Sequence, residues 1–217
     1  MKYETIFWDW NGTIIDDLQA SLDSVNGLFV KRNMKSFETP EDYFKVFCFP
    51  IVEYYKKAGF DFSIEPYEKL AVEYVDNYNR LSKSCRVFPD IKNALKKLHE
   101  KGVRQIILSA SERAGLVEWL AALDILKYFD DVIGNDNIYA VGKADIALNW
   151  LDAHEEIDIS RALLIGDTTH DFEVAEAMCC DCALVARGHN SRSDLAATGS
   201  PVFSDGKELY DHIIKQL

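Results

Sequence analysis

The second half of the chain alternates short apolar runs with longer amphipathic segments, and this alternation most constrains its fold. Apolar runs typical of strands occupy Val103–Ser111, Phe129–Gly134 and Arg161–Asp171. Apolar residues recur at helical spacing in Pro89–Gly102, Arg113–Leu123 and Lys143–Glu156. The alternation continues with a helix at 171–179, strands at 182–188 and 201–204, and a closing helix at 207–217. It predicts an α/β fold, with a parallel sheet covered by helices on both faces.

Residues 17–84 break this alternation. They contain no strand pattern, are rich in Tyr and Phe, and place Leu18, Leu22, Val25 and Phe29 on one helical face. The chain is therefore expected to form a Rossmann-like core from residues 1–16 and 85–217, with an inserted all-helical domain over 17–84. Most aromatic residues of the insert are expected to pack in its core, and a minority to line a substrate pocket between insert and core.

Composition excludes several classes of partner. The 217 residues carry a formal net charge of −12, which disfavours nucleic acid and anionic membranes as partners. No apolar run is long enough to span a membrane, and the first residues lack the pattern of a signal peptide. The five cysteines form no disulfide framework or metal-ligand pattern, so they are expected to be reduced thiols, in a cytoplasmic protein.

Polar side chains stand where the predicted strands end. Asp9 follows the first strand, Ser109 ends the second, and Asp167 follows the run LLIG. In an open parallel sheet, the carboxyl ends of the strands form the ligand crevice, so these groups are expected to converge. The two carboxylates are hard oxygen ligands suited to Mg²⁺, and Asp171 can assist them.

Donors and a positive charge complete this constellation. Lys143 begins a predicted helix after a glycine, and the turn at residues 11–13 offers backbone N–H groups. A carboxylate nucleophile beside Mg²⁺, with lysine and N–H donors around a tetrahedral anion, is a phosphoryl-transfer site.

Four segments of the chain resemble motifs of the haloacid dehalogenase superfamily. They are DWNGT at 9–13, ILSAS ending at Ser111, GK at 142–143 and IGDTTHD at 165–171. Phosphatases of that superfamily read DxDGT, a strand ending in Ser or Thr, a Lys, and GD-x(3,4)-D. The order agrees along essentially the whole chain, and the helical insert resembles the family's cap. The resemblance is greatest to phosphoglycolate-phosphatase-like members, which act on small organophosphates.

The resemblance implies a Mg²⁺-dependent hydrolase of a small phosphomonoester, with Asp9 forming an aspartyl-phosphate. The implied metal ligands are Asp9, Asp167, Asp171 and the backbone carbonyl of Asn11. The implied phosphate-binding residues are Ser109, Ala110, Gly12, Thr13 and Lys143.

Asn11 stands where those phosphatases carry their acid–base aspartate. An amide cannot transfer a proton at neutral pH, and losing general acid–base help costs ~10²–10⁴ in rate. In one interpretation another group substitutes for the missing acid. His170 is the sharpest candidate because its ordinary pKa suits proton transfer, although it can equally pack at a helix start. Asp16 and Asp17 are weaker candidates, being expected N-caps of the first helix of the insert.

Three alternative interpretations of Asn11 need no substitute acid. The substrate can have a good leaving group, as an aryl or acyl phosphate has. The chemistry can differ, as in phosphonate hydrolases, which use a Schiff-base lysine of the cap, or in dehalogenases. The protein can also have lost turnover and act as a phosphate-ligand sensor.

Two smaller expectations concern individual residues. Asn11 precedes Gly12, so deamidation can supply a carboxylate at position 11 in a fraction of the molecules. Arg113, Arg187 and His189 follow strand ends and are expected mainly in solvated loops, although they can reach an acidic substrate tail.

Overall fold

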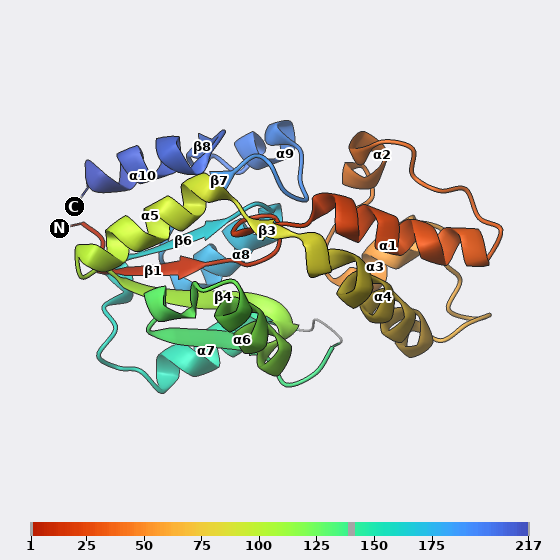
Figure 1. Ribbon diagram of the computed structural model, residues 1–217, viewed down its shortest axis with the longest axis horizontal. Coiled ribbons are helices and arrows are strands. Elements are labelled where there is room, and N and C mark those ends of the chain that lie inside the picture. Colours follow the sequence, from red (N-terminus) through yellow and green to blue (C-terminus); the bar gives the residue numbers. More distant parts are fainter. Residues whose placement is uncertain (1, 139–141, 217) are drawn as a thin grey trace.

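The computed structural model describes residues 2–138 and 142–216, and its centre is a six-stranded parallel sheet (Figure 1). The strand order is β5-β4-β1-β6-β7-β8. The strands are β1 (Thr5–Trp8), β4 (Arg104–Glu112), β5 (Asp131–Asn135), β6 (Ala162–Gly166), β7 (Asp181–Val185) and β8 (Val202–Phe203). The predicted α/β class with a parallel sheet is confirmed, and β1 occupies the middle of the sheet between β4 and β6.

Helices cover both faces of the sheet. They are α5 (Pro89–Glu100), α6 (Arg113–Ala122), α7 (Lys143–Asp152), α8 (Thr169–Met178), α9 (Arg192–Ala197) and α10 (Gly206–Ile214). Ile6 and Trp8 of β1 pack on the side of α5, α6 and α10, whereas Phe7 packs on the side of α7 and α8. The strand is fully buried because its side chains alternate between two helical layers.

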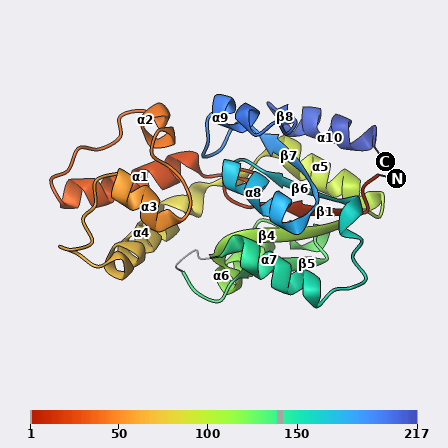
Figure 2. The same cartoon turned by 180° about the vertical axis from the view of Figure 1, so that it is seen from behind.

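A helical insertion lies beyond the carboxyl ends of the strands (Figures 1 and 2). It contains α1 (Leu18–Lys31), α2 (Pro40–Phe44), α3 (Ile51–Lys57), α4 (Tyr67–Leu81) and the short η1 (Ser82–Ser84). Leu22, Val25 and Phe29 of α1 pack with Tyr43, Tyr54 and further aromatic residues in a separate apolar cluster. The predicted helical character of this segment is confirmed, and its own core explains its many aromatic residues.

A two-stranded antiparallel ribbon joins the insertion to the sheet. It pairs β2 (Ile15–Asp16) with β3 (Arg86–Val87), one strand on each side of the insertion. Two-residue strands show no periodicity, so the sequence pattern could not reveal them. The helix α9 was not predicted, because its six residues are too few for a helical repeat to show. Other differences are at element ends, where 3-10 turns η2 (Leu126–Tyr128) and η3 (Ile159–Arg161) precede β5 and β6. The last residue of the predicted closing helix, Leu217, lies outside the described residues.

Two further expectations concern the surface and the thiols. Among the described residues, no helix is both long and apolar enough to cross a membrane. All five cysteines are free thiols. Cys180 and Cys182 are half-buried at the junction of α8 and β7, whereas Cys179 ends α8 in the left-handed conformation and is exposed.

Candidate functional site

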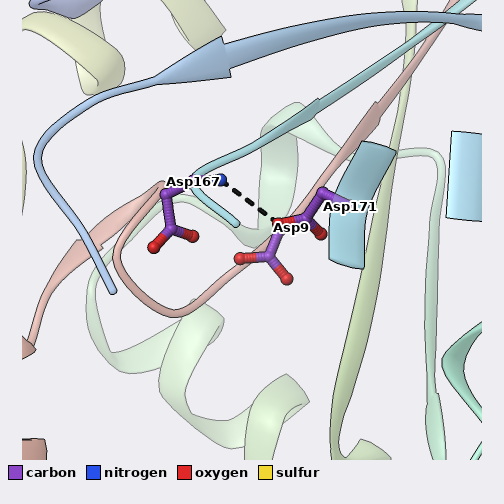
Figure 3. Close-up of side chains that lie close together, drawn as sticks. All are labelled: Asp9, Asp167 and Asp171. Atoms are coloured by element: carbon purple, nitrogen blue, oxygen red, sulfur yellow. Dashed lines mark hydrogen bonds between the residues drawn. The ribbon is translucent and has the colours of Figure 1, made fainter. Parts of the chain in front are cut away.

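Three aspartates from two strand ends meet at the carboxyl edge of the sheet (Figure 3). Asp9 follows β1, Asp167 follows β6, and Asp171 lies in the first turn of α8. All three are buried, and each offers an oxygen within 4.8 Å of those of the other two. Neighbouring parallel strands end side by side, so residues more than 150 positions apart share one site.

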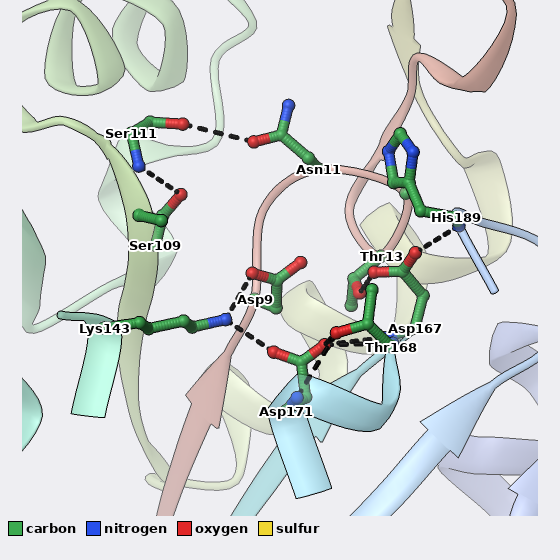
Figure 4. Close-up of polar contacts among 12 residues, drawn as sticks. Asp9, Asn11, Thr13, Ser109, Ser111, Lys143, Asp167, Thr168, Asp171 and His189 are labelled. Atoms are coloured by element: carbon green, nitrogen blue, oxygen red, sulfur yellow. Dashed lines mark hydrogen bonds and ion pairs between the residues drawn. The ribbon is translucent and has the colours of Figure 1, made fainter. Parts of the chain in front are cut away.

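Lys143 is buried against two of these carboxylates (Figure 4). Its Nζ lies 2.5 Å from Oδ1 of Asp9 and 2.5 Å from Oδ1 of Asp171. Burial alone lowers the pKa of Lys143, but the charges of Asp171 and Asp9 outweigh it and raise the pKa. Burial raises the pKa of Asp171, and the adjacent lysine reverses this shift and lowers it overall. Lys143 therefore stays charged.

Asp167 and Asp171 are fixed by donors around them. Oδ1 of Asp167 accepts from the Thr13 hydroxyl at 2.9 Å, and Oδ2 accepts from the backbone N–H of His189 at 2.6 Å. Oδ2 of Asp171 accepts from the Thr168 hydroxyl at 2.6 Å and from the Thr168 backbone at 3.0 Å, which completes a capping box at the start of α8. Both carboxylates are thus oriented by local secondary structure.

Two glycines allow the backbone to approach the Asp167 carboxylate closely. Gly12 has φ of +70°, and a Cβ there would lie 2.4 Å from Oδ2 of Asp167. At Gly188 a Cβ would lie 1.9 Å from the same atom. Any side chain at either position would collide with the carboxylate. The chain therefore needs glycine where the β1 turn and the β7 turn approach Asp167.

The donor set fits a hard divalent cation. Burial raises the pKa of Asp9 well above its usual value, although Lys143 opposes the shift. Burial likewise raises the pKa of Asp167 to about 6, against the opposing charge of His189. Lys143 pairs with only two of the three buried carboxylates, and a cation between all three would relieve the remaining repulsion. The cluster could hold a metal ion.

Ser109 and Ala110, which we predicted to bind phosphate, lie on β4 and line a cavity that opens over the three aspartates. Ser109 is buried, and its Oγ accepts from the backbone N–H of Ser111 at 3.1 Å, which leaves its hydroxyl hydrogen free to donate. The other predicted donors have partners within the protein. The Thr13 hydroxyl donates to Asp167, and the Gly12 N–H donates to Oδ1 of Asp17 at 2.7 Å.

Asn11 is held by three hydrogen bonds. Its Nδ2 donates to Oδ2 of Asp17 at 2.6 Å and to the Tyr78 hydroxyl at 2.7 Å. Its Oδ1 accepts from the Ser111 hydroxyl at 3.1 Å, as Figure 4 shows. Tyr78 belongs to α4 of the insertion, so Asn11 connects the sheet, the start of the insertion and its last long helix.

Asp17 occupies the N-cap position of α1, as expected, but its side chain does not cap the helix. The side chain makes no capping hydrogen bond and is 1% exposed. It instead accepts from Gly12, Asn11 and Tyr78. Burial raises the pKa of Asp17, but His189, together with the bonds from Tyr78 and Asn11, lowers it overall. Asp16 is exposed in β2, paired with Arg86.

His189 is also not in a solvated loop. It is buried, with Nε2 3.5 Å from Oδ1 of Asp17 and Nδ1 2.9 Å from the Tyr43 hydroxyl. Burial lowers the pKa of His189, but Asp17 outweighs burial and raises the pKa to about 9. Arg187 is half-buried and bonds to Asp90 at 2.9 Å. Neither the Asp17 nor the His189 position carries a sequence signal of burial, because both follow turns rather than lie within a periodic segment.

His170 lies at the cavity wall, away from the Asn11 hydrogen bonds. Its Nδ1 is 2.9 Å from Oε2 of Glu173, and its ring stacks on Phe49 with centroids 4.3 Å apart. These contacts hold the imidazole against the insertion, and they involve neither Asp9 nor Asn11.

A cavity of about 290 Å³ opens over the three aspartates, between the sheet and the insertion. The sheet side contributes Asp9, Ser109, Lys143 and Asp167. The insertion side contributes mainly aromatic side chains, from α2 to α4. The predicted candidates from four separate segments therefore face one cavity.

Fold and site together are those of an α/β protein that carries a buried acidic cluster at the carboxyl edge of its parallel sheet. Residues 6–185 match the family model described as haloacid dehalogenase-like hydrolase, and the chain belongs to this family. The family resemblance predicted from the four motifs is confirmed.

Curated relatives of the chain are phosphoglycolate phosphatases. The protein of Aliivibrio fischeri is 26% identical over 137 residues, which cover 63% of this chain and 59% of that protein. That of Haemophilus influenzae is 22% identical over 219 residues, covering 96% and 97%. The chain thus spans about six tenths of the length of the first of these relatives.

Solved structures share the whole fold. A haloacid dehalogenase-like hydrolase from Streptococcus pneumoniae has a TM-score of 0.83 at 19% identity, covering 98% of this chain and 99% of that one. A predicted phosphatase from Clostridium acetobutylicum has a TM-score of 0.80 at 20% identity, with the same coverage. At these identities the likeness establishes the fold alone.

Proposed function

We propose that this protein is a Mg²⁺-dependent hydrolase of a small phosphomonoester. The observation that carries the proposal is the cluster of Asp9, Asp167 and Asp171, with Lys143 bonded to two of them. The match to phosphoglycolate phosphatases supports a phosphorylated small molecule as substrate. Phosphoglycolate itself is one candidate by this similarity.

The metal ligands in this proposal are Asp9, Asp167 and the backbone carbonyl of Asn11, with Asp171 assisting. When bound, Mg²⁺ supplies positive charge that neutralises the phosphoryl oxygens and the carboxylates. Lys143 adds a second fixed charge, and the Ser109 hydroxyl adds a donor. These groups orient the phosphate with its phosphorus toward Asp9.

Asp9 is the nucleophile in this proposal. Its Oδ1 is bonded to Lys143, so we assign the attack to Oδ2. A bond forms between this oxygen and phosphorus while the phosphorus–oxygen bond of the ester breaks, and its electron pair leaves with the alcohol oxygen. Water then attacks phosphorus of the aspartyl-phosphate, releases phosphate and restores the carboxylate.

Residues 17–84 form the cap in this proposal, and residues 1–16 and 85–217 form the core. The cap closes the cavity over the phosphate and excludes bulk water, which strengthens the electrostatic interactions beneath it. Three cap residues bond to the site: Asp17 and Tyr78 through Asn11, and Tyr43 through His189.

A second candidate is a phosphate-ligand sensor with little turnover. It is favoured by Asn11, whose amide transfers no proton and is held by Asp17 and Tyr78. A Schiff-base phosphonate hydrolase is disfavoured, because every lysine considered for that role is exposed. These lysines are Lys31, Lys35, Lys45, Lys56 and Lys57.

Phosphate release from phenyl phosphate tests the proposal. Turnover is expected with Mg²⁺, and its loss is expected with EDTA and in Asp9→Asn. Asp16→Asn is the matched control, since Asp16 is exposed and outside the site. Binding of inorganic phosphate with intact Asp9 but no turnover in long assays would favour the sensor instead.

A further inference from the structure

We propose that the substrate is an aryl phosphate, the ester of an uncharged phenol, rather than a phosphoester with a second anionic group. This inference rests on the proposed function, because it concerns the leaving-group side of the same site. Two features of the site support it: the aromatic side chains that line the cavity, and the amide of Asn11, which cannot transfer a proton.

The leaving-group side of the cavity is aromatic. The insertion contributes Tyr43, Phe47 and Phe49, together with Tyr54, Tyr67 and Tyr74. Phe47 stacks on Tyr43 with ring centroids 4.8 Å apart. Rings in such walls favour offset-stacked or edge-to-face contact with a further ring. A cavity of about 290 Å³ is at the small end for ligand sites, so it suits a single ring better than a nucleoside.

Among the described residues that line the cavity, Lys143 is the one lysine or arginine, and it is bonded to Asp9 and Asp171. Of the two lining histidines, His170 is bonded to Glu173, and His189 has Nε2 3.5 Å from Asp17 and donates its backbone N–H to Asp167. Lys143 and His189 thus face four buried aspartates, namely Asp9, Asp17, Asp167 and Asp171. A carboxylate on the leaving group would add a further negative charge to a site where the aspartates already outnumber the cations, which is costly.

The insertion offers a polar atom to a phenol that carries a neutral substituent. Tyr54 lines the cavity and is 3% exposed, and its hydroxyl has no hydrogen-bond partner within the described chain. A buried hydroxyl without a partner is unfavourable, and a ligand group that bonds to it would remove that cost.

Asn11 points to the same substrate class independently. Both hydrogens of its Nδ2 are already donated, to Asp17 and to Tyr78, and an amide cannot supply a proton to a leaving oxygen. A phenolic oxygen, with a pKa of about 10, leaves far more readily as an anion than an alkoxide. An aryl ester thus removes the need for the acid that this site lacks.

Binding of two matched phosphonates tests the inference without turnover. Benzylphosphonate imitates phenyl phosphate, and 3-phosphonopropionate imitates phosphoglycolate, since in each a CH₂ group replaces the ester oxygen. Calorimetric titration of the wild-type protein with Mg²⁺ is expected to show benzylphosphonate binding at least roughly 10-fold more tightly. Equal affinities, tighter binding of 3-phosphonopropionate, or no binding of either would overturn the inference.

Phe47→Leu tests whether the rings cause the preference. Loss of one aromatic contact is expected to weaken benzylphosphonate by roughly 2- to 12-fold and to leave 3-phosphonopropionate unchanged. Ile64→Ala is the control, because Ile64 is 82% exposed on the insertion and does not line the cavity. Equal weakening of both ligands by Phe47→Leu would contradict a ring-specific role.

Kinetics separates the two proposals. If kcat/KM is higher for phenyl phosphate than for phosphoglycolate, both the phosphatase proposal and the substrate-class inference hold. If phosphoglycolate is hydrolysed faster, the substrate-class inference fails and the phosphatase proposal stands. If neither ester is hydrolysed while benzylphosphonate still binds more tightly, the phosphatase proposal fails and the preference for a ring stands.

Discussion

Nδ2 of Asn11 lies 2.6 Å from Oδ2 of Asp17, and the Tyr78 hydroxyl lies 2.6 Å from the same oxygen. Asp17 is buried, and Gly12 donates to its other oxygen. The neutral amide donor at position 11 therefore stabilises the buried carboxylate of Asp17. A carboxylate at position 11 would instead lie at hydrogen-bond distance from that of Asp17 and repel it. The amide at position 11 and the acid at position 17 are complementary.

The Asn11→Asp variant is accordingly expected not to become a faster enzyme by itself. It loses the donor to Asp17 and places two carboxylates together, which should lower the free energy of unfolding at pH 7.5 by about 1–3 kcal/mol. Chemical denaturation of the variant and of the wild type measures this difference. Unchanged stability together with a large gain on alkyl phosphates would contradict the complementarity.

The double variant Asn11→Asp with Asp17→Asn exchanges the two groups. It should recover part of the lost stability, because an amide and a carboxylate again face each other. If the missing acid limits turnover, hydrolysis of alkyl phosphates should rise by up to about 10² relative to wild type. Asp17→Asn alone is the control, and it should show no such gain.

Mg²⁺ is expected to stabilise the protein more at pH 7.5 than at pH 5. Without metal, the pKa of Asp167 is raised from 3.8 to about 6, so the folded state binds a proton more tightly. That contribution to stability is present below pH 4 and is lost as pH rises through 6. Above pH 6 the ionised cluster binds Mg²⁺, worth about 2.7 kcal/mol at 100-fold excess over Kd.

Thermal melts with and without Mg²⁺ at the two pH values measure this effect, with Asp167→Asn as the matched variant. The Tm shift should be larger at pH 7.5 and should fall strongly in Asp167→Asn. Equal shifts at both pH values, or an equal shift in the variant, would show that the cluster is not the Mg²⁺ site.

The ion pair of His189 and Asp17 should stabilise the fold at neutral pH and lose this effect in alkali. The pKa of His189 is raised from 6.5 to about 9, so its contribution is complete below pH 6.5 and is lost as pH rises through 9. His189→Gln should therefore cost most near pH 6 and least above pH 9.5. Denaturation across this range is the measurement, and a cost independent of pH would contradict the pairing.

Deamidation of Asn11 should be slow in the folded protein. The reaction requires the Gly12 nitrogen to attack the side-chain amide, yet this N–H donates to Asp17 and the amide is held by three hydrogen bonds. Mass spectrometry of the tryptic peptide with Asn11 should show an intact amide after incubation under native conditions, and deamidation only in denaturant. Rapid native deamidation would contradict this geometry.

The fold could be predicted because its signals are local and repeated. The alternation of strands and helices after residue 85 indicates the sheet, and polar residues at strand ends indicate that Asp9, Ser109 and Asp167 converge. Lys143, at the start of a predicted helix after a glycine, was expected to converge with them, and it lies against Asp9 and Asp171.

The contacts around Asn11 could not be predicted in the same way. Asp17 looks like a helix cap, and its burial depends on Tyr78 and His189, which are distant in the chain. The residue type of His170 and its place beside Asp171 favour proton transfer, but its contacts are with Glu173 and Phe49. Side-chain direction at a turn depends on tertiary packing rather than on periodicity.

The most direct test of the central claim is to trap the phosphoryl group on Asp9. The wild-type protein is mixed with phenyl phosphate and Mg²⁺, quenched in acid and digested, and the peptide containing Asp9 is examined by mass spectrometry. The proposed mechanism predicts the mass of one added phosphoryl group on Asp9, absent in Asp9→Asn and absent without Mg²⁺. Turnover with no such adduct on Asp9, or turnover retained in Asp9→Asn, would contradict it.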